Sequence, residues 1–331
     1  MREAVLVGKK RFEVREVPEP VLGEGEVLIK VRYCGICGSD LDTYVGGVTI
    51  SHGHEFSGDI VKLGSRVSGW EVGAQVTAES IISCGDCYWC AHGELGRCDN
   101  FAKTWLQRTP AFATYTKARY DQLHRIPSEL SYQEAALTEP TAVALHAFRL
   151  SEMPKGATVA ILGLGYIGQI VARLAKLSGA GAVYATDGSE SRLELVRDVV
   201  DEIMDVNAVD PLERIFQLTG SRGPDVVFEC AGVVSTTQQS ITLVRKGGTI
   251  VVVGLCFDPI EVLASNVAMK EIKIQGAMCF LPHEYAASLD LIRKRQIDVA
   301  PLISCEMPLD AINEAFERAL NRDGVKILIK P

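Results

Sequence analysis

The segment that decides the fold is Thr158-Val159-Ala160-Ile161-Leu162-Gly163-Leu164-Gly165-Tyr166-Ile167-Gly168. A short β-rich run passes directly into the pattern G-x-G-x-x-G, and an amphipathic stretch follows to about Leu177. This pattern becomes informative when a strand precedes it and a helix follows it. The first glycine permits a tight turn, the second lets a pyrophosphate approach the backbone, and the third lets helix and strand pack closely. The pattern therefore predicts a dinucleotide-binding unit, with a simple tight turn as the alternative. The expected cofactor contacts are Gly163, Gly165, Tyr166, Ile167 and Gly168.

A second β-rich run, residues 182–187, ends in Asp187, which follows Gly163 by 24 positions. A carboxylate at about this distance hydrogen-bonds the ribose hydroxyls of NAD. It also repels the 2′-phosphate of NADP, so the pattern favours NAD. Arg192 could soften that exclusion, or it could stack near the adenine and serve NAD as well. We therefore place Asp187 and Arg192 in a predicted NAD site.

Further apolar runs continue this pattern along the chain. Their continuous apolar character and the helical stretches between them are typical of a parallel sheet that is covered on both faces. The sequence therefore predicts an α/β fold with a doubly wound, six-stranded Rossmann sheet. The remaining strands are expected at about residues 202–205, 225–230, 249–254 and 272–274.

The composition limits the kind of partner. The chain has 331 residues, which suggests about two domains, and its 47% hydrophobic and 23% charged residues are typical of globular proteins. A net charge of −8 gives no attraction to nucleic acid or anionic membranes, so a small molecule is the expected partner. The longest apolar run, 250–257, is far shorter than a membrane helix, and residues 1–4 do not resemble a leader. We expect a cytoplasmic protein.

Four cysteines, Cys84, Cys87, Cys90 and Cys98, have the spacing C-x2-C-x2-C-x7-C. In a cytoplasmic protein such a spacing indicates metal ligands rather than disulfides. Four thiolates close a tetrahedron, which suits a structural zinc. An iron–sulfur cluster is the rival, although its usual last gap is three residues and a proline follows it. Free buried cysteines are the remaining alternative.

A second candidate metal site lies upstream, where residues 33–40 contain two cysteines and residues 52–58 contain two histidines and Glu55. Cys, His and Glu together are typical ligands of a catalytic zinc that leaves one position open. Cys34 and Cys37 could instead form a redox pair, but no thioredoxin-like pattern surrounds them. Cys34 is best interpreted as a small buried hydrophobic residue.

The order of these features resembles the zinc-containing branch of the medium-chain dehydrogenase/reductase superfamily, which includes the alcohol and polyol dehydrogenases. The resemblance covers essentially the whole chain. Residues 53–58, 138–147 and 325–329 are most similar to 2,3-butanediol, sorbitol and threonine dehydrogenases. It implies a mainly β, GroES-like catalytic domain over 1–150 and 282–331, with a zinc lobe at 84–98 and a Rossmann domain inserted at 151–281. It also implies a homo-oligomer, either a dimer or a homotetramer.

The same resemblance implies roles for particular residues. Cys37 and His54 would bind the catalytic zinc, with Glu55 as the third ligand and Glu139 reaching the metal directly or through water. Glu55 could instead orient His54 or pair with an arginine, and Glu139 could be a helix cap. Ser39 would pass on the proton of the substrate hydroxyl. The cofactor would be approached by Val253, Gly254 and Leu255. Its nicotinamide end would lie near Met278, Cys279 and Phe280.

One residue departs from the family pattern. Many relatives have a histidine three positions after the serine, whereas this chain has Asp42. The proton could therefore leave through Asp42, through water or through His52. The implied reaction is hydride transfer to NAD from a secondary alcohol with an adjacent hydroxyl, as in 2,3-butanediol or a polyol. Alternatives are an L-threonine 3-dehydrogenase or a general secondary-alcohol dehydrogenase, a fold that has lost its chemistry, and a zinc-dependent nucleic-acid module.

Overall fold

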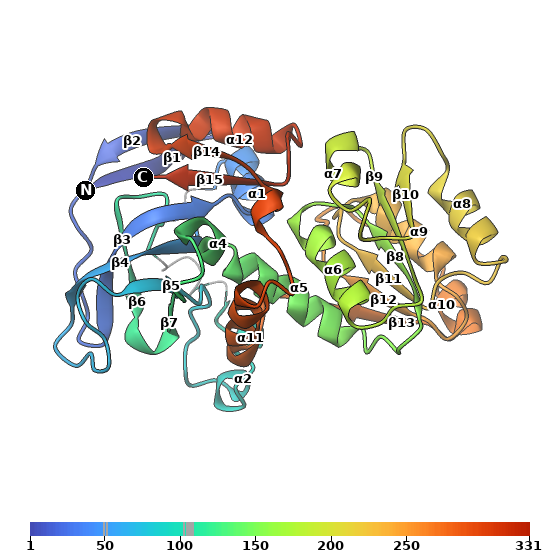
Figure 1. Cartoon of the computed structure of the whole chain (residues 1–331), viewed down its shortest axis with the longest axis horizontal. Helices are drawn as coiled ribbons and strands as arrows, with labels where there is room; N and C mark the ends of the chain where they lie inside the picture. Colours follow the sequence, from blue (N-terminus) through green and yellow to red (C-terminus); the bar gives the residue numbers. More distant parts are fainter. Residues whose placement is uncertain (49, 51, 102, 104–108) are drawn as a thin grey trace. The chain divides into compact units, whose positions relative to one another are not determined.

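A computed structural model describes residues 1–48, 50, 52–101, 103 and 109–331. The chain forms two compact units (Figure 1). Unit 1 comprises Met1–Ala142 and Phe280–Pro331, and unit 2 comprises Val143–Cys279. The first division falls inside helix α5 (Thr138–Leu150), eight residues before the boundary placed from the sequence. A continuous helix shows no break in its hydrophobic pattern, so the sequence gives no sign of a division there.

Unit 1 contains a seven-stranded sheet that is mainly antiparallel, as expected for a GroES-like domain. Its strands lie in the order β14-β15-β3-β4-β5-β7, and β6 also pairs with β3. The C-terminal strand β15 lies beside β3 (Figure 1). The last strand of the chain therefore joins a sheet that also contains strands from its first third. The strands are β3 (Glu26–Gly35), β4 (Glu55–Leu63), β5 (Gln75–Ala78), β6 (Tyr115–Arg119), β7 (Leu123–Arg125), β14 (Ile303–Pro308) and β15 (Lys326–Lys330).

A separate hairpin and several helices complete unit 1. The hairpin consists of β1 (Arg2–Gly8) and β2 (Arg11–Glu16). Its Phe12 stacks on Tyr44 at 5.3 Å between ring centroids and meets Phe316 at 4.8 Å, so three distant segments share one aromatic core. The helices are α1 (Gly38–Gly46), α2 (Tyr88–Ala91), α4 (Tyr132–Ala136), α11 (Pro282–Arg293) and α12 (Ile312–Leu320). Short 3-10 turns are η1 (Leu95–Arg97), η2 (Tyr120–Gln122), η3 (Ala300–Leu302) and η4 (Leu309–Ala311).

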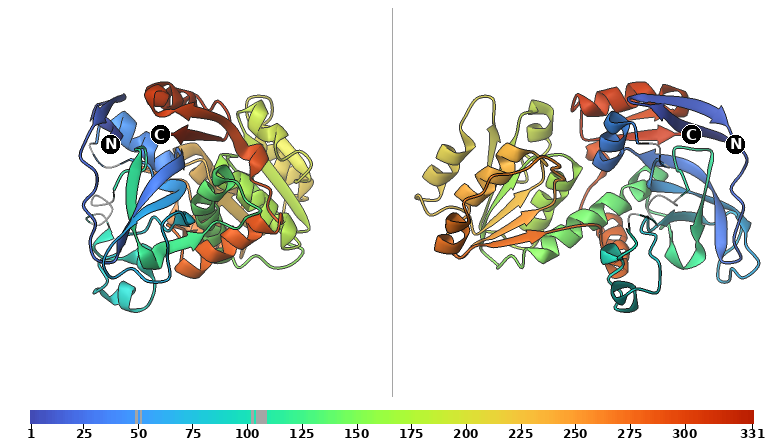
Figure 2. Two further views of the ribbon diagram at one scale, coloured as in Figure 1. Left: turned by 60° about the vertical axis from the view of Figure 1, so that its left-hand side comes forward. Right: turned by 180° about the vertical axis from the view of Figure 1, so that it is seen from behind.

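Unit 2 is built on a six-stranded parallel sheet in the order β10-β9-β8-β11-β12-β13. This confirms the predicted Rossmann sheet, and helices α6 to α10 flank it (Figure 2). The strand order reverses between β8 and β11, and ligands of such sheets bind at this switch point. The strands are β8 (Thr158–Leu162), β9 (Ala182–Asp187), β10 (Glu202–Asp205), β11 (Val226–Glu229), β12 (Thr249–Val252) and β13 (Lys273–Gly276). The helices are α6 (Tyr166–Leu177), α7 (Glu190–Glu194), α8 (Pro211–Leu218), α9 (Val234–Leu243) and α10 (Ala264–Lys270).

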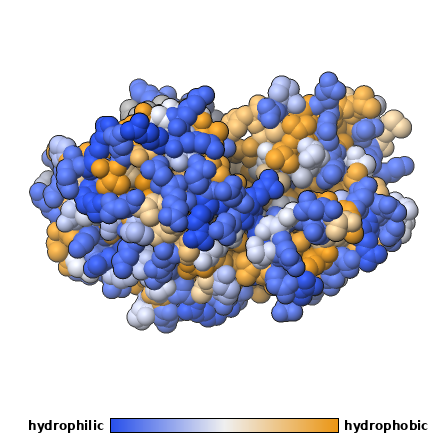
Figure 3. All heavy atoms as spheres, turned by 90° about the horizontal axis from the view of Figure 1, so that it is seen from above, coloured by the Kyte–Doolittle hydropathy of each residue, from blue (hydrophilic) through white to orange (hydrophobic). Residues whose placement is uncertain are grey.

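The surface agrees with the charged composition of the chain. Hydrophilic side chains cover much of the face in Figure 3, with hydrophobic ones between them. Within the described residues, no helix combines the length and the apolar character that a bilayer span requires.

Candidate metal centres and dinucleotide site

The first candidate centre lies in unit 1, where the end of β3 meets the start of β4. Cys37 caps the N-terminus of α1, and His54 and Glu55 stand at the beginning of β4. One ligand atom from each of these three residues lies within 4.8 Å of the other two. Protein ligands of zinc lie about 2.0–2.3 Å from the metal. The structure therefore brings together three residues that the sequence analysis placed at a catalytic zinc.

Asp40 belongs to this centre, although the sequence analysis did not single it out. Its side chain is buried, and its Oδ2 accepts a hydrogen bond of 3.2 Å from the backbone N–H of Cys37. Its Oδ1 lies 3.7 Å from Nδ1 of His54. Asp40 therefore links the cysteine turn to the histidine. A local signal existed, because an acidic residue three positions after the N-cap is typical of a capping box.

Lys326 is a second residue that the sequence analysis missed. Its ammonium nitrogen lies 2.8 and 2.7 Å from the two carboxylate oxygens of Glu55 and donates to the carbonyl of Ile36 at 3.0 Å. Gly35 makes room for this pair, because a Cβ there would collide with the carboxylate of Glu55. Pairing with an arginine was one alternative for Glu55. The partner is instead a lysine from the last strand.

Glu139, near the start of α5, is held by a serine. The hydroxyl of Ser80 donates a 2.6 Å hydrogen bond to Oε1 of Glu139, and both side chains are buried. On α1, the hydroxyl of Ser39 lies 3.4 Å from Sγ of Cys37. The candidate proton carrier thus lies beside a candidate metal ligand.

The charges around Cys37 fit a cation. Burial raises the pKa of the Cys37 thiol, and nearby carboxylates raise it further. These carboxylates belong to Glu55, Asp40 and Glu139, whereas Lys326 lowers the same pKa. Buried carboxylates that outnumber the buried cation are costly unless more positive charge is present. A divalent metal ion would supply that charge and would stabilise the thiolate.

His52 and Asp42 are the two candidate side chains for carrying the proton away from Ser39. His52 is buried, and its Nε2 lies 3.0 Å from the hydroxyl oxygen of Thr43. That hydroxyl also donates to the backbone carbonyl of Ser39 at 3.2 Å. Asp42 is half-buried, and burial raises the pKa of its carboxyl. His52 is therefore linked through Thr43 to the backbone of Ser39.

A cavity of about 240 Å³ in unit 1 is lined by His54 and Ser80. Its other walls combine polar residues, such as Glu79, Gln122 and Lys117, with apolar ones, such as Phe56 and Ile82. Glu79 is fixed by a 3.0 Å contact between its Oε1 and Nε2 of His124. The polar groups of this mixed lining can form hydrogen bonds with water or with a hydroxylated ligand.

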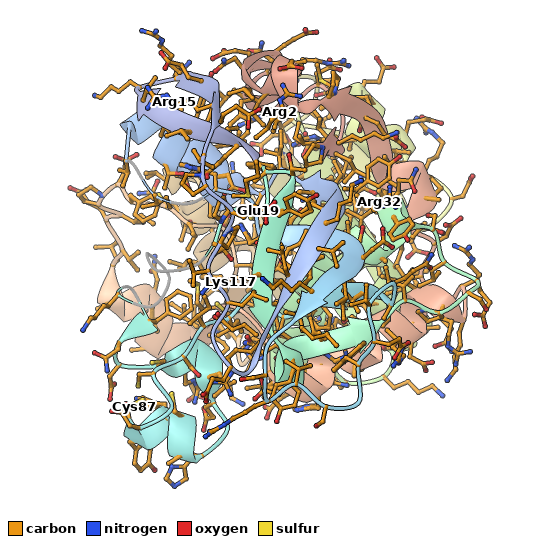
Figure 4. The ribbon with its side chains drawn as sticks, turned by 90° about the vertical axis from the view of Figure 1, so that its left-hand side faces the viewer. Arg2, Arg15, Glu19, Arg32, Cys87 and Lys117 are labelled. Atoms are coloured by element: carbon orange, nitrogen blue, oxygen red, sulfur yellow. The ribbon has the colours of Figure 1, made fainter. Side chains whose placement is uncertain are left out.

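The second candidate metal centre is the cysteine lobe around α2 and η1. Figure 4 labels Cys87 in this lobe and, for orientation, Lys117 on strand β6 of the unit 1 sheet. Sulfur-to-sulfur distances are 3.4 Å for Cys87–Cys90, 3.5 Å for Cys84–Cys98 and 3.9 Å for Cys84–Cys90. Four ligands at about 2.3 Å from a zinc ion give edges of about 3.8 Å, so these sulfurs fit a tetrahedral zinc site.

The thiols of this lobe differ in their electrostatics. Hydrogen bonds from the backbone N–H groups of Cys90 and Asp99 lower the pKa of Cys87 to about 6. Burial raises the pKa of Cys98 to about 11. A metal ion would favour the thiolate form of all four. His92 is exposed and contacts Tyr88, as expected for a residue outside the ligand set.

The dinucleotide site is formed by β8, the glycine loop and α6, with Tyr166 and Ile167 in the first turn of the helix. A Cβ at Gly168 would collide with the carbonyl of Gly163, so the third glycine allows helix and strand to pack closely. Among the described residues, no atom lies within 4 Å of the place where a Cβ of residue 165 would stand. This space lies beside the N-cap of α6, where a phosphate group is favoured.

Asp187 ends β9 with its carboxylate oriented by backbone groups. Its Oδ2 accepts from the N–H of Leu164 at 2.7 Å and its Oδ1 from the N–H of Ser189 at 2.8 Å. Each carboxylate oxygen can accept more than one hydrogen bond, so both can still serve a ribose. Arg192 lies on α7, and its carbonyl accepts a 2.8 Å hydrogen bond from Gln169.

The remaining expected cofactor residues fall in different environments. Val253, Gly254 and Leu255 directly follow β12, and Leu255 is exposed. Met278 is exposed, and Cys279 has a positive φ of 58°. Phe280 belongs to unit 1, is buried and packs against Tyr285 at 5.4 Å between ring centroids. Its ring is therefore part of a hydrophobic contact inside unit 1.

The chain matches two sequence families. Residues 23–128 match the family described as alcohol dehydrogenase GroES-like domain, and residues 167–294 match the zinc-binding dehydrogenase family. A sorbitol dehydrogenase of Halalkalibacterium halodurans is 35% identical over 98% of this chain and 97% of its own length. An (R,R)-butanediol dehydrogenase of Bacillus subtilis is 30% identical over the full length of both.

A solved structure gives the same result. It is a putative zinc-binding dehydrogenase from Sinorhizobium meliloti bound to NADP, with a TM-score of 0.92 and 32% identity. The alignment covers 100% of this chain and 99% of that protein. Both units of the chain therefore have counterparts in one homologous structure.

Proposed function

The chain belongs to the zinc-binding alcohol dehydrogenase family, and on that premise we propose that it oxidises a secondary alcohol with an adjacent hydroxyl, using NAD. The observation that carries this proposal is the Ser80–Glu139 hydrogen bond, because Ser80 also lines the cavity that His54 borders. A simple apolar alcohol would have no use for a buried carboxylate there, because a buried charge is costly unless it is paired or bound to a metal. A second hydroxyl of the substrate would donate a hydrogen bond to the carboxylate of Glu139.

In this proposal, Cys37, His54 and Glu55 would hold the catalytic zinc, and Glu139 would reach it directly or through water. A carboxylate oxygen of Glu55 lies within 4.8 Å of the ligand atoms of Cys37 and His54. Both of its oxygens also contact Lys326, and each still has a lone pair for a metal ion. Cys84, Cys87, Cys90 and Cys98 hold the structural zinc.

When bound, zinc supplies Lewis acidity toward an alcohol oxygen, and NAD supplies a hydride acceptor. The residues of the chain provide alignment and proton transfer. Ser39 Oγ, beside Cys37, accepts the hydroxyl proton of the substrate and passes it on. Asp40 keeps the cysteine turn and His54 in register, and Asp187 orients the adenosine ribose.

The substrate would be a polyol rather than a small apolar diol, because the cavity provides further hydrogen-bonding partners. Glu79, Gln122 and Ser80 offer acceptors and donors along its walls. A cavity of about 240 Å³ has room for several water molecules. A chain of four to six hydroxylated carbons would displace such water and replace its hydrogen bonds.

A steady-state NAD-reduction screen tests this function. The panel contains sugar alcohols, 2,3-butanediol, threonine and ethanol, each with NAD and with NADP. We expect the highest kcat/KM for a polyol with NAD. Ethanol or another monohydric alcohol exceeding every diol would refute the role of Glu139. A preference for threonine would support the alternative that the family resemblance raised. The cytoplasmic location and the homo-oligomeric state stay predictions.

A further inference from the structure

Glu229, the last residue of β11, stands where three loops of the dinucleotide site meet. It is fully buried, and in the parallel sheet it pairs with Leu162 of β8 and Val252 of β12. These neighbours lead directly into the glycine loop and into residues 253–255. Glu229 therefore lies at the switch point of the sheet, at the carboxyl ends of its strands, where dinucleotides bind.

The hydrogen bonds of Glu229 hold two of these loops. Its side-chain Oε1 accepts from the N–H of Ala231 at 3.0 Å and of Gly232 at 2.9 Å, and from the hydroxyl of Thr236 at 2.7 Å. Its backbone carbonyl accepts from the N–H groups of Val253 at 2.9 Å and Gly254 at 3.0 Å. One residue thus fixes the loop after β11, the start of α9 and the loop after β12.

The loops also touch one another around Glu229. A Cβ at Gly232 would lie 2.9 Å from the carbonyl oxygen of Leu255, and a Cβ at Gly163 would lie 2.9 Å from the backbone nitrogen of Ala231. The loop after β11 is therefore packed between the glycine loop and the loop after β12. A displacement of this middle loop would move both of its neighbours.

The second carboxyl oxygen of Glu229 has an unusual environment. Oε2 is buried and has no hydrogen-bond partner among the residues that the structure describes. It points toward Gly254, where a Cβ would stand 2.8 Å from it. A buried charged oxygen without a partner is costly, whereas a neutral carboxylic acid is tolerated much better. Burial raises the pKa of Glu229, although the hydrogen bonds from Thr236, Gly232 and Ala231 lower it in part.

We propose that Glu229 is a positioning residue of the dinucleotide site, which as a neutral carboxylic acid locks residues 230–232 and 253–255 against the glycine loop. Oε1 is the oxygen that accepts the three hydrogen bonds. The inference rests on the proposed dinucleotide site, but the family resemblance gave no role to Glu229 or to residues 230–232. Glu229 need not touch the cofactor to control the shape of its site.

Three variants test the proposal. Glu229→Gln keeps the shape and the neutral acceptor, and Glu229→Leu removes the acceptor for all three side-chain hydrogen bonds. Val226→Ala is the matched control, because Val226 is buried and begins the strand that Glu229 ends. The first readout is the Kd for NADH from the fluorescence of the purified zinc enzyme. The second is hydrogen–deuterium exchange of residues 230–232 and 253–255 without cofactor.

We expect Glu229→Leu to raise the Kd for NADH by about tenfold or more and to speed exchange in both loops, since buried hydrogen bonds are lost. Glu229→Gln should match the wild type in both measurements, and Val226→Ala should lower only the Tm. In turnover, the Leu variant should raise KM for NAD more than KM for the alcohol.

Unchanged NADH binding and unchanged loop exchange in Glu229→Leu would overturn the proposal, as would a Gln variant as impaired as the Leu variant. These results would leave the proposed function intact. Failure of the wild type to bind NADH or NADPH would instead refute the proposed function, and this proposal with it.

Discussion

Lys326 and Glu55 form a buried ion pair across 271 positions of sequence, with both carboxylate oxygens of Glu55 within 2.8 Å of the ammonium nitrogen. The pairing of β15 with β3, and of β3 with β4, brings them together through Gly35, which is opposite Leu328 on one side and Glu55 on the other. The side chains are 4% and 1% exposed. The last strand of the chain is therefore part of the candidate catalytic centre.

The first prediction concerns this pair. Lys326→Met, measured without zinc at the Cys37–His54–Glu55 centre, should lower the free energy of unfolding by about 3–5 kcal/mol, because the charge of Glu55 would then remain buried without a partner. Urea unfolding measures the change. Lys330→Met, an exposed position on the same strand, is the control and should cost less than about 1 kcal/mol. Equal effects of the two substitutions would show that the pair does not stabilise the fold.

The second prediction separates the two metal centres. Cys98→Ser should lower the Tm and reduce the zinc content from two ions per chain to one, because a closed four-thiolate site contributes folding energy. Cys37→Ser should abolish turnover with little change in Tm. Cys256→Ser, outside both clusters, is the control for thiol loss. Plasma emission spectrometry and differential scanning fluorimetry provide the measurements. Iron in the purified protein would instead support the cluster alternative.

Local patterns were sufficient to predict unit 2 from the sequence. Expected strands at 158–162, 182–187 and 202–205 coincide with β8, β9 and β10, because a strand, a glycine turn and a helix are encoded by neighbouring residues. The later strands were shifted by one or two residues at their ends. β13, for example, covers Lys273–Gly276 rather than 272–274, and its mostly exposed residues give little hydrophobic signal.

Local patterns predicted only part of the candidate catalytic centre. Cys37, His54 and Glu55 were indicated by residue type, but Lys326 was not, since a lysine in an apolar strand shows no local sign of its distant partner. Asp40 carried a capping signal that the sequence analysis did not use. The Ser80–Glu139 bond joins residues 59 positions apart, and a serine is too common to indicate such a contact.

The third prediction concerns cofactor choice. Asp187→Ala should weaken NAD binding and improve NADP relative to it, because it removes the ribose acceptor and the repulsion of a 2′-phosphate. The expected shift in the ratio of kcat/KM values is about tenfold or more, corresponding to the loss of hydrogen bonds to a charged group. Asp205→Ala, at the end of the neighbouring strand β10, is the control. A wild-type enzyme that prefers NADP would contradict our interpretation of Asp187.

The fourth prediction concerns acid stability. Although burial opposes it, hydrogen bonds from the N–H of Thr158 and from Arg245 and Arg222 lower the pKa of Asp225 below its usual value of 3.8. A carboxyl with a lowered pKa in the folded state stabilises the protein above its unfolded pKa and loses this effect as the pH falls through the folded pKa. Asp225→Asn should therefore destabilise unit 2 at pH 7 by about 1–3 kcal/mol.

The effect of Asp225→Asn should shrink as the pH falls below about 4, since the wild type then loses the same interaction. Asp198→Asn, at an exposed position of unit 2, serves as the control and should have little effect at any pH. Urea unfolding at pH 7, 5 and 3.5 gives the comparison. A difference between wild type and Asp225→Asn that grows toward low pH would contradict the assigned direction of the pKa shift.

The last prediction tests how Ser80 controls substrate choice. Its hydroxyl donates to Oε1 of Glu139 at 2.6 Å, and this bond fixes the direction of the carboxylate beside the cavity. Ser80→Ala removes a hydrogen bond to a charged acceptor, worth about 1.5–3 kcal/mol, so kcat/KM for a polyol should fall by about tenfold or more. A monohydric secondary alcohol has no second hydroxyl for Glu139, and its kcat/KM should change much less. The ratio of the two values separates a lost specificity contact from a general loss of activity.

Ser128→Ala is the matched control, because Ser128 also donates to a glutamate, Glu129, but at an exposed position. If Ser80→Ala reduces both substrates by the same factor, Glu139 acts on the metal centre alone and not on the adjacent hydroxyl.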